Sequence, residues 1–208
     1  MTSKRREGNN RRQELVNATL ECIANEGLQG ATVRRVSECA GVTNGLIRFY
    51  FSGKNELIRA AYSALLNHIY TTARIGIDNE LLSAKRRLRN FIEATLSPPI
   101  VAPRTVLLWA NFLPLTYSDP EMAIIRRKAY VDTTDVLATL IEQSFKEDNR
   151  EFSATDIENF SIKANALIDG LWLDGSMYSE KFQDGALVKI GLEAVSSVLR
   201  LELIDIQK

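Results

Sequence analysis

Residues 30–57 read GATVRRVSECAGVTNGLIRFYFSGKNEL and contain two short helical patterns. Thr32 is a residue type that caps helix N-termini, and we expect it to begin a helix that ends before Gly41. Thr43 is a second such cap and opens another short helix, which ends near the aromatic run 49–51. Two short helices joined by a glycine-containing turn of about four residues form a helix-turn-helix. The spacing therefore predicts a helix-turn-helix unit.

Helical periodicity continues on both sides of this stretch. Upstream, apolar residues recur every three to four positions over 10–26, and Gly27 can end that helix. Pro114 interrupts a later pattern, so we expect a kink or an early helix end near Phe112. The remaining helices are expected over 54–69, 88–95, 103–112, 120–145, 153–172 and 184–201. The sequence thus predicts an all-α chain of about nine helices.

The overall charge is balanced, with 26 Lys and Arg against 26 Asp and Glu, but its distribution is uneven. Residues 1–60 carry a net charge of +4, which suggests that this part meets a polyanion. A solvated basic tail at residues 1–12 would give the same asymmetry. The start Lys4-Arg5-Arg6 precedes no apolar run, and no stretch approaches 18 apolar residues. We therefore expect neither a secretory signal nor a membrane span, and a cytoplasmic location.

Catalytic and metal chemistry find little support in the composition. Cys22, Cys39 and His68 cannot complete a four-ligand zinc site, and no triad surrounds the single histidine. We expect no catalytic residue, no metal and no cofactor. Both cysteines are interpreted as small buried hydrophobes, with a redox role as the alternative.

The quoted stretch resembles the DNA-binding domain of the TetR (tetracycline repressor) family of bacterial regulators. The likeness rests on the elbow 40–42, the aromatic cluster 49–51, and the Lys54 and Leu57 that follow. The resemblance implies two domains. These are a helix-turn-helix DNA-binding domain over 8–68 and a ligand-sensing and dimerisation domain over 69–208.

The resemblance also implies which side chains meet DNA. Arg34 could pair with guanine, Asn44 could read adenine, and Gly45 would allow close approach to a base edge. Position 48 departs from the family, because many members carry an aromatic residue where this chain has Arg. The implied DNA contacts are Thr32, Arg34, Thr43, Asn44, Gly45, Arg48, Tyr50 and Lys54. Phe49 and Phe51 are expected to pack inside the domain.

One short helix reads only a few base pairs, so we expect a homodimer that places two recognition helices ~34–36 Å apart on a palindromic operator. The last two helices combine small and large apolar residues and could form a four-helix interface. The expected interface residues are Leu167, Leu171, Leu187, Ile190, Ala194 and Val198. An internal core face is the alternative reading of the same pattern.

The second domain is expected to sense a small molecule. Aromatic faces with a carboxylate suit an organic cation, and the segment 166–173 is similar to choline-responsive repressors of glycine betaine synthesis. The expected ligand-binding residues are Trp109, Phe112, Tyr130, Asp169 and Trp172. These aromatic residues could instead fill a core, and the ligand could be an unrelated hydrophobic molecule. A helical enzyme or an interaction module without DNA binding are the rival classes.

Overall fold

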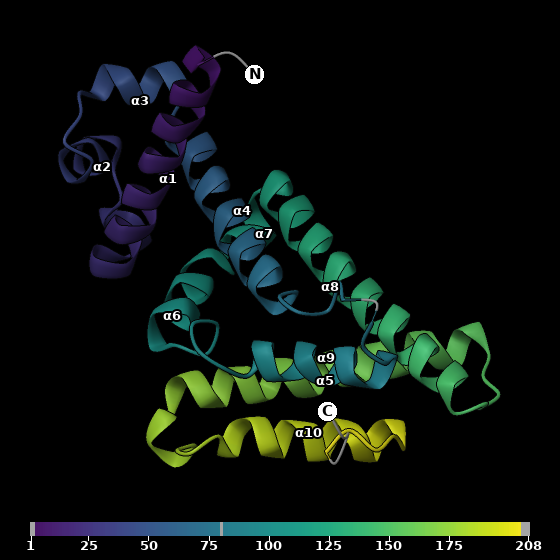
Figure 1. Cartoon of the computed structure of the whole chain (residues 1–208). Helices are drawn as coiled ribbons and strands as arrows, with labels where there is room; N and C mark the ends of the chain where they lie inside the picture. Colours follow the sequence, from purple (N-terminus) through teal and green to yellow (C-terminus); the bar gives the residue numbers. More distant parts are fainter. Residues whose placement is uncertain (1–2, 80, 205–208) are drawn as a thin grey trace. The chain divides into compact units, whose positions relative to one another are not determined.

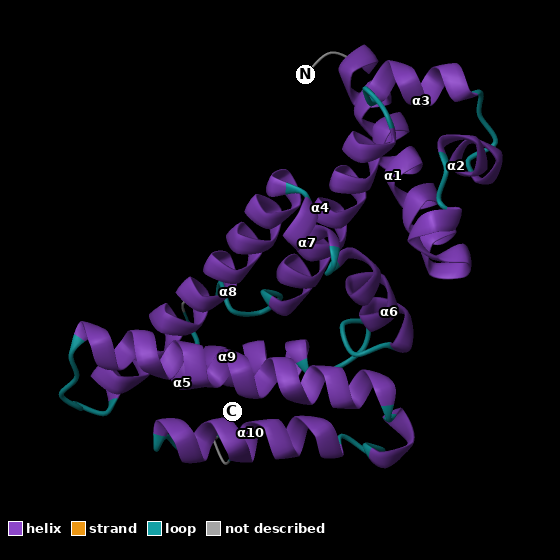
Figure 2. Cartoon of the chain, turned by 180° about the vertical axis from the view of Figure 1, so that it is seen from behind, coloured by secondary structure: helices purple, strands orange, loops and turns teal. Residues whose placement is uncertain are grey.

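The computed structural model describes residues 3–79 and 81–204, with side chains described from Gly8 onward, so those of Lys4, Arg5 and Arg6 lie outside it. Within these ranges the chain forms ten α-helices, one short 3-10 helix and no strand (Figure 2). The all-α prediction is confirmed. The helix beyond the nine expected is α7 (Leu115–Ser118), a single turn after Pro114. None of the described helices is both long and apolar enough to cross a membrane.

The helices form two compact units. Unit 1 comprises residues 1–67 and 107–126, and unit 2 comprises residues 68–106 and 127–208. Three helices contribute residues to both units: α4 (Lys54–Ala73), α6 (Pro103–Phe112) and α8 (Pro120–Glu147).

Unit 1 begins with α1 (Ser3–Gly30), α2 (Val33–Cys39) and α3 (Asn44–Tyr50) (Figure 1). The predicted cap of α2 is confirmed, because the Thr32 hydroxyl accepts a hydrogen bond of 3.2 Å from the Arg35 amide. Apolar side chains of α1 to α4 and of residues 107–126 fill the core. Its fully or nearly fully buried members include Leu15, Ile23, Val36, Ile47, Phe51, Leu57, Tyr62 and Phe112.

Gly27 breaks α1 where the sequence predicts a helix end. Its φ of 73° lies in the left-handed region, and α1 continues beyond this kink to Gly30. The Leu28 amide donates a hydrogen bond of 3.2 Å to the Asn111 side-chain oxygen on α6. The turn after α1 is therefore tied to α6 inside unit 1.

Pro114 ends α6 as expected, since α6 stops at Phe112 and α7 begins after the proline. Asp119 then starts α8, because its carboxylate accepts hydrogen bonds from the amides of Glu121 and Met122. Pro114 therefore separates α6 from α7, and Asp119 separates α7 from α8.

Unit 2 contains α5 (Ala84–Thr95), α9 (Ala154–Met177), the 3-10 turn η1 (Ser179–Lys181) and α10 (Ala186–Leu199). α9 and α10 run antiparallel side by side (Figure 1). Ser153 and Asp156 form the predicted capping box of α9. The last helix begins at Ala186 and not at Asp184, because Asp184 and Gly185 both have positive φ. That start was predicted two residues too early.

Gly175 brings α9 close to α10, and it generates a prediction about stability. A Cβ at position 175 would lie 2.2 Å from Leu187 Cδ2, whereas a Cβ at Gly170 on the same helix meets nothing within 4 Å. Both substitutions to alanine gain helix propensity, but Gly175→Ala also overpacks the contact. We expect Gly175→Ala to be less stable than Gly170→Ala by about 1–3 kcal/mol. Urea unfolding at one protein concentration measures the difference, and equal midpoints would contradict the packing.

Candidate nucleic-acid interface and ligand cavity

The expected DNA contacts on α2 are exposed. Thr32 stands at the N-terminus of α2, with its hydroxyl engaged by the Arg35 amide. The Arg34 side chain is 83% exposed and forms an ion pair of 3.0 Å with Glu38 one turn along the helix. An exposed pair of this kind contributes little stability, so the guanidinium can exchange Glu38 for a phosphate or a base.

The N-terminal end of α3 carries three exposed residues in a row, Thr43, Asn44 and Gly45. Thr43 precedes α3, but its side chain makes no capping hydrogen bond. A Cβ at Gly45 would meet nothing nearer than the Thr43 hydroxyl at 3.8 Å, so packing within the chain does not require glycine there. The side chains at this end are therefore available to an outside partner.

Asn44 is partly engaged inside unit 1. The buried Ser37 hydroxyl lies 2.6 Å from the Asn44 side-chain oxygen and 2.7 Å from the Arg34 carbonyl oxygen. A hydroxyl has one hydrogen, so it donates to one of these two oxygens, and the amide can present its NH₂ to Ser37 when the carbonyl receives that hydrogen. Either arrangement leaves one end of the Asn44 amide for a base. The contact also links α2 to α3 across the elbow.

The remaining expected DNA contacts lie on α3 and at the start of α4. Arg48 is exposed on α3, and no ion pair to it occurs among the described residues. Tyr50 is half-buried, with its ring edge against Phe49 at 5.1 Å between centroids. Lys54 opens α4, where its ammonium lies 3.4 Å from the Leu28 carbonyl oxygen. These groups give α3 a cationic flank.

The aromatic cluster divides between core and surface. Phe51 is 1% exposed, with the Arg12 guanidinium 4.7 Å from its ring centroid, so its predicted packing role is confirmed. The same prediction for Phe49 is wrong, because this side chain is 79% exposed. Two residues correspond to about 200° around a helix, so Phe49 points away from the buried face that carries Ile47. The helical phase could have revealed this exposed aromatic group beside the expected DNA contacts.

The two cysteines also differ from the prediction that both are buried. Cys22 on α1 is buried, but Cys39, the last residue of α2, is exposed. Their sulfur atoms lie 2.9 Å apart. No group of three or more His, Cys, Asp or Glu side chains among the described residues could hold a metal ion.

The five expected ligand-binding residues are distributed over both units. In unit 1, Trp109 is half-buried, and Phe112 is fully buried with its ring 5.0 Å from that of Tyr62. In unit 2, Tyr130 is 38% exposed, and the exposed Asp169 accepts a hydrogen bond of 3.1 Å from Asn165. Trp172 is buried, and its indole N–H donates to the Ile100 carbonyl oxygen at 2.9 Å.

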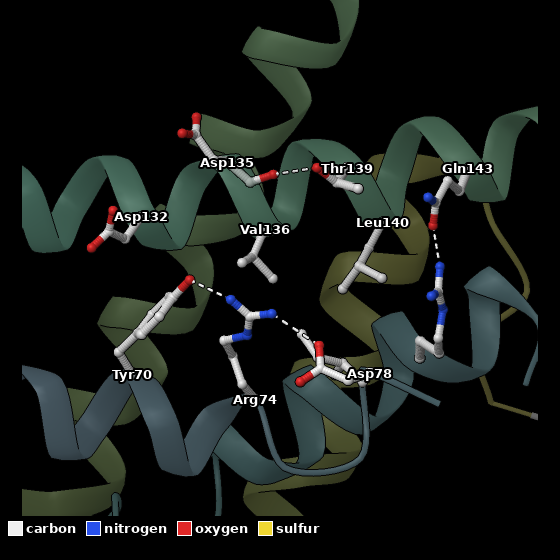
Figure 3. A pocket seen from close by; sticks show the side chains of 11 residues that line it. Tyr70, Arg74, Asp78, Asp132, Asp135, Val136, Thr139, Leu140 and Gln143 are labelled. Carbon is white, nitrogen blue, oxygen red and sulfur yellow. Dashed lines mark hydrogen bonds and ion pairs between the residues drawn. The ribbon is translucent and has the colours of Figure 1, made fainter. Parts of the chain in front are cut away.

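Unit 2 contains a cavity of about 350 Å³ that the sequence did not predict (Figure 3). This volume is within the range of small-molecule sites. Side chains from the end of α4, from the following segment, from α5 and from α8 line it. Its polar members are Tyr70, Arg74, Asp78, Arg87, Asp132, Asp135, Thr139 and Gln143.

Opposite charges meet inside this cavity. The Arg74 guanidinium donates to Asp78 at 2.9 Å and to the Tyr70 hydroxyl at 2.8 Å (Figure 3). The hydrogen bonds to Asp78 and then to Tyr70 raise the pKa of Arg74 above its ordinary value. The buried Nε of Arg87 has no hydrogen-bond partner, although another nitrogen of this guanidinium donates to Gln143. The guanidinium of Arg74 thus occupies the space between the carboxylate of Asp78 and the phenol of Tyr70.

The cavity residues on α8 share a helical spacing that the sequence contains. Asp132, Asp135, Thr139 and Gln143 recur every three to four positions and so lie on one helix face. Their polarity is typical of a solvated face, and the partners from α4 and α5 are distant in the sequence. Only the folded chain brings the two groups together.

The expected interface residues lie on α9 and α10. Leu187 is 4% exposed and packs against Gly175 inside the protomer, whereas Ile190 is 41% exposed. Leu167, Leu171, Ala194 and Val198 are half-buried. Other large apolar residues of α9 are exposed without having been predicted, namely Ile162, Leu173 and Met177.

Two family models match the chain. Residues 15–61 match the tetR family of bacterial regulatory proteins, and residues 84–200 match the C-terminal domain of BetI-type transcriptional repressors. The HTH-type transcriptional regulator BetI of Pseudomonas paraeruginosa is 28% identical over 192 residues, which cover 91% of this chain and 93% of the relative.

Solved structures share the fold. A proposed transcriptional regulator from Pseudomonas aeruginosa PAO1 has a TM-score of 0.83 at 29% identity, covering 92% of this chain and 91% of that one. A proposed transcriptional regulator from Saccharomonospora viridis, crystallised with choline, has a TM-score of 0.71 at 16% identity and covers 93% of this chain and 97% of that one.

Proposed function

The chain belongs to the TetR family of bacterial regulatory proteins, with a C-terminal domain of the BetI type, and we propose that it represses transcription as a homodimer on a palindromic operator. Family membership makes it a transcriptional regulator and not an enzyme. In our proposal, residues 8–68 read DNA in the cytoplasm, and residues 69–208 dimerise and bind a small organic inducer. Binding of the inducer causes the protein to dissociate from the operator.

The observation that carries DNA reading is the two-sided character of α3. Thr43, Asn44 and Gly45 are exposed at its N-terminal end, while Ile47 is fully buried on the other side. A recognition helix presents its first residues to base edges in the major groove, and flanking groups bind phosphates. Arg48 and Lys54 supply the flanking cations, and Thr32 and Tyr50 supply hydroxyl groups.

Arg48 is the sharpest test of this interface. If the guanidinium reads a base, Arg48→Ala should weaken operator binding by about 1–3 kcal/mol. If it binds phosphate, the variant should reduce by about 1 the slope of the logarithm of the binding constant against the logarithm of the salt concentration. The control is Arg127→Ala, which removes the same charge from an exposed position of unit 2. Fluorescence anisotropy with a selected duplex at several salt concentrations measures both quantities. Equal affinity and slope for the two variants would contradict the proposal.

The dimer is proposed to form through the exposed faces of α9 and α10. Ile162, Leu173 and Met177 lie on one stripe of α9, and Ile190 is exposed on α10. An operator that needs two recognition helices requires a second copy of the chain, so a second copy is the occupant we propose for this apolar face. Leu187 would support the interface from inside the protomer.

Leu173→Glu should convert the dimer into monomers, because it places a charge in an apolar interface. Sedimentation velocity should show the change from twice the 23.3 kDa chain mass to the single chain mass. Leu81→Glu is the matched control, since Leu81 is 95% exposed outside α9 and α10. A wild-type protein that sediments as a monomer would overturn the dimer.

The inducer is proposed to be an organic cation related to choline. The support is the BetI-type domain together with aromatic and acidic side chains in unit 2, including Tyr130, Asp169 and Trp172. A quaternary ammonium has no N–H to donate, so aromatic faces and carboxylates are the groups that can bind it. The cavity beside Tyr70 and Asp78 is a second place where a cation could bind, in exchange for Arg74.

Inducer binding must favour a dimer geometry that fits the operator poorly. A coupling of about 1–3 kcal/mol, typical of allostery, would lower operator affinity about 5- to 150-fold. We propose that α8 and the break at Pro114 transmit the shift to α4. Support comes from Arg59 on α4, which forms a two-pronged ion pair of 2.9 Å with Asp119 at the start of α8.

Choline and its neutral carbon analogue, 3,3-dimethyl-1-butanol, separate charge from shape. Choline should lower the affinity of the protein for the operator about 5- to 150-fold at constant ionic strength, and the analogue should leave this affinity unchanged. Asp169→Asn should abolish this response if the predicted aromatic set binds the cation. Asp78→Asn should abolish it if the cation binds in the cavity beside Tyr70 and Asp78.

If a long-chain acyl compound releases the protein from the operator and choline does not, the result contradicts the proposal of a cationic inducer. It favours a hydrophobic inducer instead. A protein that binds no duplex at low salt would favour an interaction module.

A further inference from the structure

We propose that Cys22 and Cys39 form a dithiol oxidation site in unit 1, which a hydroperoxide converts into an intramolecular disulfide. The two residues come from different helices, α1 and α2, and are 17 positions apart. Their sulfur atoms are 2.9 Å apart. A disulfide bond measures about 2.05 Å, so the sulfur atoms need to approach by less than 1 Å.

The two thiols have different access to solvent. Cys39 is exposed at the C-terminal end of α2, where a small oxidant can reach it. Cys22 is 1% exposed, and its thiol donates a hydrogen bond to Cys39 Sγ. Burial and then this hydrogen bond raise the pKa of Cys22 to about 12. Cys39 is therefore the sulfur that the peroxide oxidises first, and Cys22 is the second thiol that resolves the product.

Charged groups surround the pair. The Arg35 guanidinium forms ion pairs with Glu26 at 2.6 Å and with Glu38 at 3.5 Å, and it interacts electrostatically with both cysteines. A guanidinium beside a sulfur atom favours the thiolate, which is the reactive form. Arg35 thus places a positive charge beside the two sulfur atoms, paired with the carboxylates of Glu26 and Glu38.

The chemistry balances with the hydroperoxide as the only oxidant. The Cys39 sulfur attacks the peroxide O–O bond, gains an oxygen and becomes a sulfenic acid, while hydrogen peroxide releases water. The Cys22 sulfur then displaces the hydroxyl group, which leaves as a second water with the Cys22 proton. Two thiols lose two electrons and two protons, and one peroxide becomes two water molecules. An added dithiol reverses the step by thiol exchange.

The site lies next to the elbow that positions α3. Cys39 ends α2, and residues 40–43 lead directly into α3. A bond from Cys39 to α1 would draw this end of α2 toward α1 and shift the elbow. We therefore expect oxidation to weaken operator binding about fivefold or more, a consequence that rests on the proposed function.

The modification itself is tested without DNA. The full-length protein is treated with hydrogen peroxide at neutral pH, and intact mass and peptide mapping follow. Wild type should lose 2 Da and yield a Cys22–Cys39 linked peptide that dithiothreitol reverses. Cys22→Ser should instead accumulate a sulfenic acid at Cys39 that dimedone traps, and Cys39→Ser should leave Cys22 unmodified.

Two results would overturn the site: both thiols of wild type still alkylating after peroxide, or dimedone trapping Cys39 while Cys22 is present. A second experiment measures the affinity for the selected duplex by fluorescence anisotropy. Cys22→Ser is the control variant, because it cannot form the disulfide. Oxidised wild type should bind more weakly than the reduced protein, and dithiothreitol should restore binding. A disulfide without any change in affinity would confirm the site and reject its link to DNA reading.

Discussion

The burial of Ile47 and Phe51 is the constraint on which the proposed DNA-reading surface depends. α3 has seven residues, and an isolated helix of this length is not stable in water. It persists because Ile47 is 0% and Phe51 is 1% exposed within the core of unit 1. The same anchoring leaves Thr43, Asn44 and Gly45 on the surface. A rigid scaffold therefore holds a short helix whose other face remains available to a partner.

Unit 1 extends this scaffold beyond the helix-turn-helix. Its segment 107–126 contacts the N-terminal helices through the hydrogen bond between Leu28 and Asn111, and through the ion pair between Arg59 and Asp119. Both contacts are polar and directional, so they hold a defined geometry more than they add stability. A segment that begins within the second predicted domain is thus part of the same compact unit as the DNA-reading helices. In our proposal, this segment carries the effect of an inducer to α3.

Local signals predicted most of the fold. Caps and breakers such as Thr32, Gly27, Pro114 and Ser153 act on the backbone within a few residues, so the sequence alone locates the helix ends they produce. The start of the last helix was missed because Asp184 adopts a left-handed conformation that is uncommon outside glycine.

The site was less predictable, because exposure and proximity are properties of the folded chain. Phe49 has a core-type side chain but lies on the outer face of α3, and Cys39 is exposed although its sulfur contacts a buried neighbour. The cavity beside Arg74 combines helices far apart in the sequence, and its charged residues have no apolar periodicity to reveal them. Residue type and spacing located α3 and its exposed N-terminal end, but not every side chain that surrounds them.

Hydroxyl-radical footprinting tests the central claim most directly, on a duplex selected by the full-length protein from a random library. Two α3 helices in a symmetric dimer should protect two stretches whose centres lie one helical turn, ~34–36 Å, or a whole multiple of it apart. A duplex with one protected stretch, or a library from which no sequence is enriched at low salt, would contradict the account.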